Sequence, residues 1–259
     1  MLFKKKPIIV ANWKMNPINS KEAKELLDLY IKTINFNNIN LVVAPPVIYL
    51  ELLKTLLISS KVNNIYLSSQ NICSEYVGAF TGEISVGMVK DFGCKYTIIG
   101  HSERRQYYQE TNELIAKKFL TALNYKLIPI VCVGETKQQL EQGELEVKSI
   151  LNKQLKFILD DYANQSVDKN LEFLIAYEPV WAIGSGLSAD TSYINSICGY
   201  IREAITNATD SKINVKILYG GSVNKDNFKS IFALPNIDGA LVGGGSLIAS
   251  EFATICNNC

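Results

Sequence analysis

The chain has 259 residues, of which 47% are apolar, and its 26 Lys and Arg nearly balance its 25 Asp and Glu. This apolar content suffices for one large core, so we expect a single domain over residues 1–259. The near-neutral charge provides no overall field that would attract nucleic acid. No apolar run reaches the ~18 residues that a membrane span needs, and no signal peptide follows the basic start. We therefore expect a cytoplasmic protein with neither nucleic acid nor membrane as a partner.

Cysteine and histidine usage limits the kinds of site that the chain can build. The six cysteines are scattered, at positions 73, 94, 132, 198, 256 and 259, and the chain is too long to depend on disulfides, so we expect reduced thiols. Cys256 and Cys259 have C-x-x-C spacing, but the sequence holds a single histidine. A four-ligand zinc site is therefore difficult to assemble, and we expect no metal.

Short apolar segments with strand character alternate with helical patterns along the whole chain. In the first half we expect strands at 8–12, 40–44, 65–69 and 96–99, followed by helices at 20–34, 47–56, 86–92 and 112–124. In the second half we expect strands at 128–133, 174–177, 215–219 and 239–242, with helices at about 144–161, 192–207, 225–232 and from about 248. Eight such units predict an α/β protein.

Strands that are apolar on both faces and separated by helices belong in a parallel sheet, and eight of them can close into a (β/α)₈ TIM barrel. The rival fold is an open doubly wound sheet with a nucleotide-binding turn. Residues 184–189 match G-x-G-x-x-A, but six residues separate the first glycine from its strand, and Asp210 precedes the next strand instead of ending it. We therefore reject the dinucleotide interpretation and predict the closed barrel.

Polar residues stand where several of the predicted strands end. In a barrel of this kind the carboxyl ends of the strands meet at one face. The first strand leads to Asn12 and Lys14, the fourth to His101, and the sixth to Glu178. A carboxylate base, a neutral imidazole donor and an ammonium group suit proton abstraction next to a carbonyl, where negative charge moves onto oxygen. Lone histidines are usually structural, and Glu178 alone is equally compatible with a solvated loop residue.

The last two strands end in glycine-rich turns, at 219–223 and 241–247. Bare backbone amides there can approach a ligand, and the short helical stretches that follow present N–H groups with positive partial charge. Such glycines also occur merely to relieve crowding in tight turns, which is less expected for two adjacent strands. We favour a phosphate site.

Several separated motifs together resemble one known family. They are Ala11-Asn-Trp-Lys-Met-Asn16, Gln70-Asn71, Gly78-Ala-Phe-Thr-Gly-Glu83, Gly100-His-Ser-Glu-Arg-Arg105, Val131-Cys-Val-Gly-Glu135, Tyr177-Glu-Pro-Val-Trp-Ala-Ile-Gly184, Tyr219-Gly-Gly-Ser-Val223 and the Gly243-Gly244 turn. In this order they resemble the triosephosphate isomerase family along essentially the full length. The resemblance implies interconversion of dihydroxyacetone phosphate and D-glyceraldehyde 3-phosphate through an enediolate, in glycolysis and gluconeogenesis, without a cofactor.

The resemblance also implies roles for individual residues. Glu178 is the base, His101 the electrophile and proton shuttle, and Lys14, Asn12 and Glu103 assist. The substrate is bound by Asn12, Lys14 and the amides of Gly184, Ser222, Gly243 and Gly244. The closing lid comprises Pro179, Val180, Trp181, Ala182, Ile183, Gly184, Ser185, Gly186, Leu187, Ser188 and Ala189. Loop 71–83 inserts into a second subunit, so that Thr81 approaches the other chain's Asn12 and Glu103 in a homodimer.

Some positions depart from the family pattern. Ala11 stands where glycine is frequent, Ser185 and Leu187 replace threonine and lysine at the lid tip, Leu140 replaces an arginine, and Gly245 replaces an alanine. None removes a catalytic group, but they leave lid motion and local stability open. Two other hypotheses remain: a sugar-phosphate epimerase, which often relies on metal or paired acids, and a barrel that binds partners without turnover.

Overall fold

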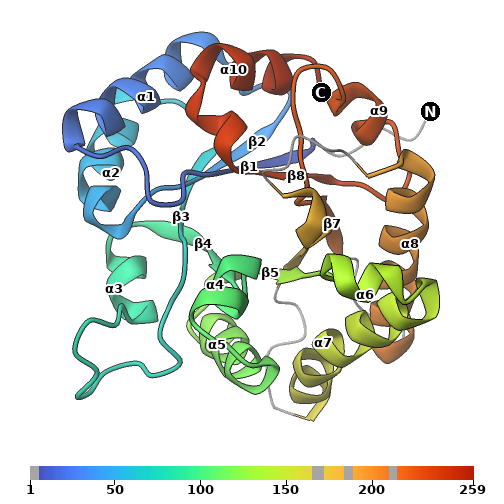
Figure 1. Cartoon of the computed structure of the whole chain (residues 1–259). Helices are drawn as coiled ribbons and strands as arrows, with labels where there is room; N and C mark the ends of the chain where they lie inside the picture. The colour runs from blue at the N-terminus through green and yellow to red at the C-terminus, as the bar shows by residue number, and fades with distance from the viewer. Residues whose placement is uncertain (1–5, 165–171, 184–188, 210–214) are drawn as a thin grey trace.

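The computed structural model describes residues 6–164, 172–183, 189–209 and 215–259. Eight parallel strands form a closed barrel in the order β1 to β8, surrounded by helices (Figure 1). The strands are β1 (Ile8–Asn12), β2 (Asn40–Ala44), β3 (Ile65–Ser69), β4 (Cys94–Ile99), β5 (Ile128–Val133), β6 (Leu174–Tyr177), β7 (Lys216–Tyr219) and β8 (Gly239–Val242). The predicted (β/α)₈ barrel is confirmed.

The helices lie outside the strands. They are α1 (Ser20–Thr33), α2 (Leu50–Ser60), α3 (Val86–Asp91), α4 (Ser102–Tyr107), α5 (Asn112–Asn124), α6 (Lys137–Glu141), α7 (Glu144–Asn164), α8 (Thr191–Ala208), α9 (Phe228–Phe232) and α10 (Ala249–Asn257). Single 3₁₀ turns precede α2, follow β6 and follow β8, at η1 (Val47–Tyr49), η2 (Val180–Ala182) and η3 (Gly244–Leu247). No helix in the described ranges combines the length and the apolar character of a membrane span.

The helices differ from the predicted set at several places. α4 and α6 are additional short helices after β4 and β5, α9 begins three residues later than expected, and α2 covers 50–60 instead of 47–56 because Val47–Tyr49 form η1. α6 begins at a capping box, in which Thr136 and Gln139 each bond the other's backbone amide. α4 and α6 show too little apolar periodicity to be recognised from the sequence, whereas the long helices around them show it clearly.

The core has two layers because successive residues of a strand point to opposite faces of the sheet. Ile8 and Val10 point into the barrel, where they join Ile98, Ile130 and Leu241 among others. Ile9 and Ala11 point outwards and pack in the layer beneath the helices. Both faces of the strands are therefore buried, as their continuous apolar sequences indicated.

Closure of the barrel depends on a glycine. Gly239 begins β8 and pairs with Ile8 of β1. A Cβ atom at position 239 would lie 1.9 Å from the Ile8 carbonyl oxygen, so only glycine allows the last strand to approach the first one here. This pairing gives all eight strands a common carboxyl-terminal rim.

Candidate active site

The polar residues predicted to meet at the strand ends do so in the structure. Asn12 ends β1, His101 follows β4 after Gly100, and Glu178 follows β6. Their side chains are buried, with 5%, 6% and 2% exposure respectively. Gly100 has φ +68°, a left-handed conformation that turns the chain from β4 into α4 and places His101 at the helix start.

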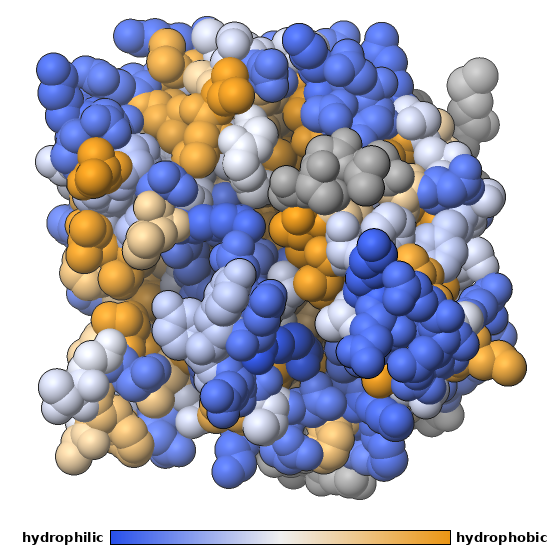
Figure 2. Space-filling view, in the orientation of Figure 1, coloured by the Kyte–Doolittle hydropathy of each residue, from blue (hydrophilic) through white to orange (hydrophobic). Residues whose placement is uncertain are grey.

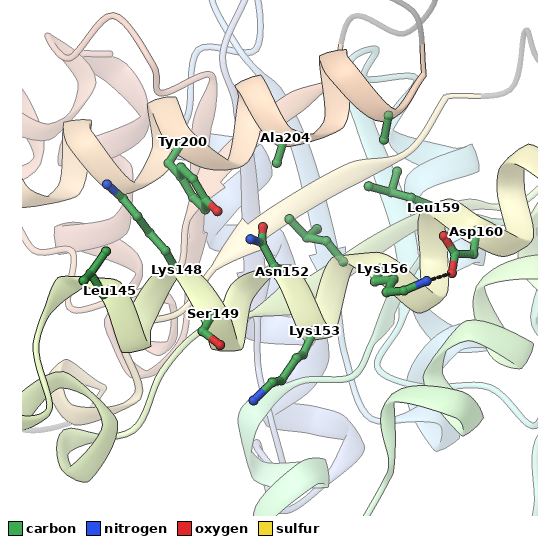
Figure 3. Close-up of a pocket in the computed structure, with 12 residues that line it drawn as sticks. Leu145, Lys148, Ser149, Asn152, Lys153, Lys156, Leu159, Asp160, Tyr200 and Ala204 are labelled. Carbon is green, nitrogen blue, oxygen red and sulfur yellow. Dashed lines mark hydrogen bonds and ion pairs between the residues drawn. The ribbon is translucent and has the colours of Figure 1, made fainter.

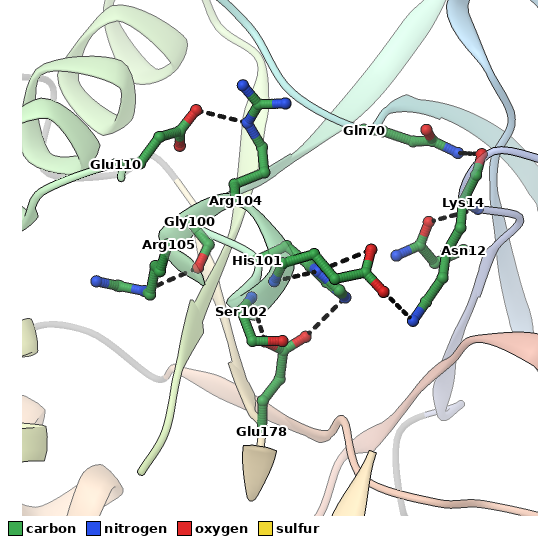
Figure 4. A network of polar contacts seen from close by, with 11 residues as sticks. Asn12, Lys14, Gln70, Gly100, His101, Ser102, Arg104, Arg105, Glu110 and Glu178 are labelled. Atoms are coloured by element: carbon green, nitrogen blue, oxygen red, sulfur yellow. Dashed lines mark hydrogen bonds and ion pairs between the residues drawn. The ribbon is translucent and has the colours of Figure 1, made fainter. Parts of the chain in front are cut away.

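Glu178 is held at the edge of the site by backbone and side-chain contacts (Figure 4). Its Oε2 accepts a hydrogen bond of 2.9 Å from the Ser102 amide, and its Oε1 lies 3.1 Å from His101 Nε2 without hydrogen-bond alignment. Its own amide donates to the Val133 carbonyl at 2.8 Å. Gly220 packs against it so closely that a Cβ there would lie 2.8 Å from Glu178 Cγ. Contacts from the ends of β4, β5 and β7 therefore fix the position of Glu178.

His101 is the N-cap residue of α4. Its Nδ1 accepts a hydrogen bond of 3.3 Å from the Glu103 amide, so a lone pair lies on that nitrogen. A neutral ring in this arrangement carries its proton on Nε2, the nitrogen that faces Glu178. This is the tautomer that a hydrogen-bond donor in the cavity requires.

Lys14 has an ammonium group that is fixed by Glu103 and a backbone that is held in an unusual conformation. Lys14 Nζ lies 2.5 Å from Glu103 Oε1. Its φ is +53°, in the left-handed region that costs a residue with a side chain about 1 kcal/mol. Asn12 Oδ1 accepts from its amide at 3.1 Å, and Gln70 Nε2 donates to its carbonyl at 2.8 Å. Asn12 and Gln70 thus stabilise the strained residue that carries the charge.

These residues line a cavity of about 170 Å³ that also includes the glycine-rich ends of β7 and β8. Ser222, Gly243 and Gly244, which were predicted to bind phosphate, lie on its wall. A Cβ at Gly243 would be 3.2 Å from Lys14 Cε, so the lysine side chain passes beside this turn. Figure 2 shows a recessed hydrophilic area near the middle of this face. The predicted site residues from Gly184 to Ser188 lie outside the described residues.

A larger groove between α7 and α8, about 690 Å³, has a different character (Figure 3). Two of its three lysines lie beside acidic neighbours: Lys156 pairs with Asp160, and Lys148 lies 2.7 Å from Glu144. No strand end contributes to its lining. The cavity at the rim therefore remains the candidate active site.

Glu135 belongs to the same rim, although the sequence assigned it no role. Its buried carboxylate accepts hydrogen bonds from Trp181 Nε1 at 2.8 Å, Tyr177 OH at 3.1 Å and Tyr193 OH at 3.2 Å. Its carbonyl accepts from the Val180 amide at 3.0 Å. Pro179 to Ile183, the described first part of the predicted lid, is therefore anchored to the end of β5. Its position two residues after the end of β5 was the available signal.

Together, the fold and the cavity define a (β/α)₈-barrel enzyme. A family model described as triosephosphate isomerase matches residues 7–259. The triosephosphate isomerase of Buchnera aphidicola subsp. Cinara cedri is 43% identical, over 96% of this chain and 97% of that protein. Those of Baumannia cicadellinicola and Vibrio vulnificus are 44% and 41% identical, with at least 95% of each chain covered. The chain belongs to the triosephosphate isomerase family.

Burial of Glu135 predicts a pH-dependent stability. Desolvation raises the pKa of this carboxyl above its ordinary value of 4.5, outweighing its hydrogen bonds. A raised folded-state pKa means that the contribution of Glu135 to stability is fully present below pH 4.5 and is lost as pH rises through the folded pKa. Glu135→Gln does not ionise, so wild type should lose stability relative to this variant as pH rises above 4.5, by up to about 1.4 kcal/mol per pH unit.

Urea unfolding of both proteins between pH 4 and pH 8 measures this difference. Glu25→Gln, at an exposed position on α1, is the matched control and should show no comparable trend. A stability difference between wild type and Glu135→Gln that stays constant with pH would contradict the prediction.

Proposed function

We propose that this protein interconverts dihydroxyacetone phosphate and D-glyceraldehyde 3-phosphate, as a cytoplasmic enzyme of glycolysis and gluconeogenesis that uses no metal or cofactor. The supporting observation is that Glu178, His101 and Lys14 surround one small cavity with glycine-rich turns on its wall. Membership of the triosephosphate isomerase family supports the same substrate. We further propose that the whole chain is one domain, since the barrel includes strands from both ends.

The reaction requires a proton to move between two neighbouring carbons. Glu178 removes a proton from C1 of dihydroxyacetone phosphate, and the C–H electrons form a C1–C2 double bond while the carbonyl electrons move onto O2. His101 Nε2–H donates to O2 and relays the proton between O1 and O2. Glu178 then returns a proton to C2, which yields the aldehyde at C1. Atoms and charge balance without a redox partner.

The remaining site residues stabilise charge and position the substrate. Lys14 offsets the negative charge of the enediolate and the phosphate, and Glu103, 2.5 Å from its Nζ, keeps the ammonium group in place. Asn12 contacts a substrate oxygen. The amides of Gly184, Ser222, Gly243 and Gly244 bind the phosphate. Pro179 to Ala189 closes over the intermediate and excludes water, which limits loss of phosphate from the enediolate.

We also propose a homodimer formed through loop 71–83. In Figure 1 this loop projects from the barrel between β3 and α3. It exposes Tyr76, Val77 and Phe80, at 49%, 81% and 48%, which is a large apolar surface to leave in water. Its base is fixed, because Lys118 Nζ donates to Asn71 Oδ1 at 3.0 Å and Thr121 Oγ1 donates to the Ser74 carbonyl at 2.7 Å.

The surface that this loop would contact in the other subunit lies beside the catalytic cavity. A hollow of about 410 Å³ is lined by Asn12, Lys14 and Glu103 together with apolar Met15 and Val47. Met15 is 93% exposed in the single chain. The partner's Thr81 would lie near Asn12 and Glu103 when its loop fills this hollow, so each site would be completed by the other subunit.

The direct test is isomerisation of dihydroxyacetone phosphate by purified protein in the presence of EDTA, with no cofactor added. We expect glyceraldehyde 3-phosphate to form at a rate proportional to enzyme concentration. A folded protein with no turnover would favour the hypothesis of a binding protein. Activity that depends on added metal would favour the epimerase-like alternative.

Glu178→Gln tests the assignment of the base. The amide has the same size but cannot accept the proton, so kcat should fall by at least about 100-fold while inorganic phosphate still binds. Glu25→Gln, an exposed position on α1, should keep wild-type turnover. Near-normal turnover of Glu178→Gln would show that another group is the base.

Thr81→Arg tests the subunit contact. The larger side chain overfills the proposed contact, and its guanidinium competes with Lys14 for Glu103, which should cost about 1–3 kcal/mol and favour the monomer in sedimentation velocity experiments. Misplacement of Asn12 and Lys14 should then lower kcat between about tenfold and 100-fold. Thr254→Arg, at an exposed position of α10, is the matched control. A fully active monomer would contradict the proposed contribution of the second subunit.

A further inference from the structure

A buried hydroxyl group connects the lysine-bearing end of β1 to the glycine-rich turn after β8. Tyr30 lies on α1, and its hydroxyl donates to the carbonyl oxygen of Ser246 in η3. The same hydroxyl accepts a hydrogen bond of 3.2 Å from the indole Nε1 of Trp13. Trp13 stands between Asn12 and Lys14 in the sequence. One side chain thus contacts Trp13 and Ser246, the direct sequence neighbours of Lys14 and Gly245 on the cavity wall, without lining the cavity itself.

The surroundings of Tyr30 leave this hydroxyl few other partners. Its ring is fully buried and packs against Trp13 at 6.2 Å and Phe252 at 4.9 Å between ring centroids. Figure 1 shows α1 and α10, which supply Tyr30 and Phe252, next to each other outside the barrel. Burial raises the pKa of Tyr30, so the hydroxyl keeps its proton and remains a donor to Ser246. Its hydrogen and one lone pair are used in defined directions.

The turn that Tyr30 holds is the one that carries the proposed phosphate amides. Ser246 closes it, because its amide and its Oγ both donate to the Gly243 carbonyl, at 2.8 Å and 2.7 Å. Gly243, Gly244 and Gly245, which directly precede Ser246, lie on the cavity wall. Three successive glycines have little intrinsic conformational preference, so their geometry must come from contacts at the ends of the turn. Ser246 is itself fully buried, and its carbonyl is the group that Tyr30 contacts.

We propose that Tyr30 is a positioning residue for substrate phosphate: it fixes the Gly243–Ser246 turn relative to Lys14. This inference rests on the proposed function for the identity of the substrate, but it also concerns inorganic phosphate, which the same amides would bind. Removal of the hydroxyl releases the Ser246 carbonyl and the Trp13 indole while the ring packing stays. The turn then samples more orientations, and fewer of them present its amides to the phosphate.

Tyr30→Phe is the direct test. We expect its affinity for inorganic phosphate, measured by titration calorimetry and as a competitive inhibition constant, to fall about threefold to tenfold. KM for dihydroxyacetone phosphate should rise by a similar factor while kcat stays within about twofold, since the lost contact serves ground state and transition state equally. A merely structural role would lower the melting temperature and leave phosphate affinity unchanged.

Tyr49→Phe is the matched control. Tyr49 is also buried, and its hydroxyl donates to a backbone carbonyl, that of Pro17, at 3.0 Å, but this carbonyl is outside the phosphate turn. It should keep wild-type phosphate affinity. Trp13→Phe serves as a second variant if Tyr30→Phe does not fold. It removes the indole donor and part of the buried ring volume, but the Tyr30 hydroxyl keeps its bond to Ser246, so it should weaken phosphate binding to a smaller extent.

Two outcomes separate this inference from the proposed function. Wild-type phosphate affinity in folded Tyr30→Phe, or in Trp13→Phe where Tyr30→Phe does not fold, would overturn the positioning role even if the wild-type enzyme isomerises its substrate normally. Weakened phosphate binding in a protein that never isomerises triose phosphate would support the positioning role while the proposed function fails.

Discussion

The site depends on the pairing of β1 with β8, which closes the sheet. Because Gly239 lacks a side chain, its strand can approach Ile8 and complete the ring of hydrogen bonds. The consecutive pairing of β4, β5 and β6 brings Glu178 within 3.1 Å of His101, and closure brings the ends of the chain together, so that Lys14 passes beside Gly243. An open sheet would place the first and last strands at opposite edges and would separate the lysine from the glycine-rich turn.

Much of this arrangement could be predicted from the sequence because strand ends are recognisable. Asn12, His101 and Glu178 each follow a short apolar run, and parallel strands bring such positions to one rim. The resemblance in separated motifs then supplied the chemistry. Sequence reasoning could also exclude a nucleotide turn at 184–189, from spacing alone.

The sequence could not show which contacts hold these residues. These contacts arise from tertiary packing: the Ser102 amide binds Glu178, Gln70 holds the Lys14 backbone, and three donors surround Glu135. The short helix α6 was equally hidden, because its start depends on a cap more than on periodic apolar residues. Tyr30 looked like any core residue of an amphipathic helix, since only the fold reveals what its hydroxyl contacts.

The left-handed backbone of Lys14 affects how substitutions at its neighbours should be interpreted. Asn12 faces the cavity, and its side chain also accepts the hydrogen bond from the Lys14 amide. Replacing Asn12 therefore changes two things at once, a candidate ligand contact and the conformation that aims the ammonium group. The energetic effects of substitutions at positions 12 and 14 should be non-additive, so neither can be assigned an independent share of catalysis. In evolutionary terms the two positions are epistatic, and an accepted change at one would require a matching change at the other.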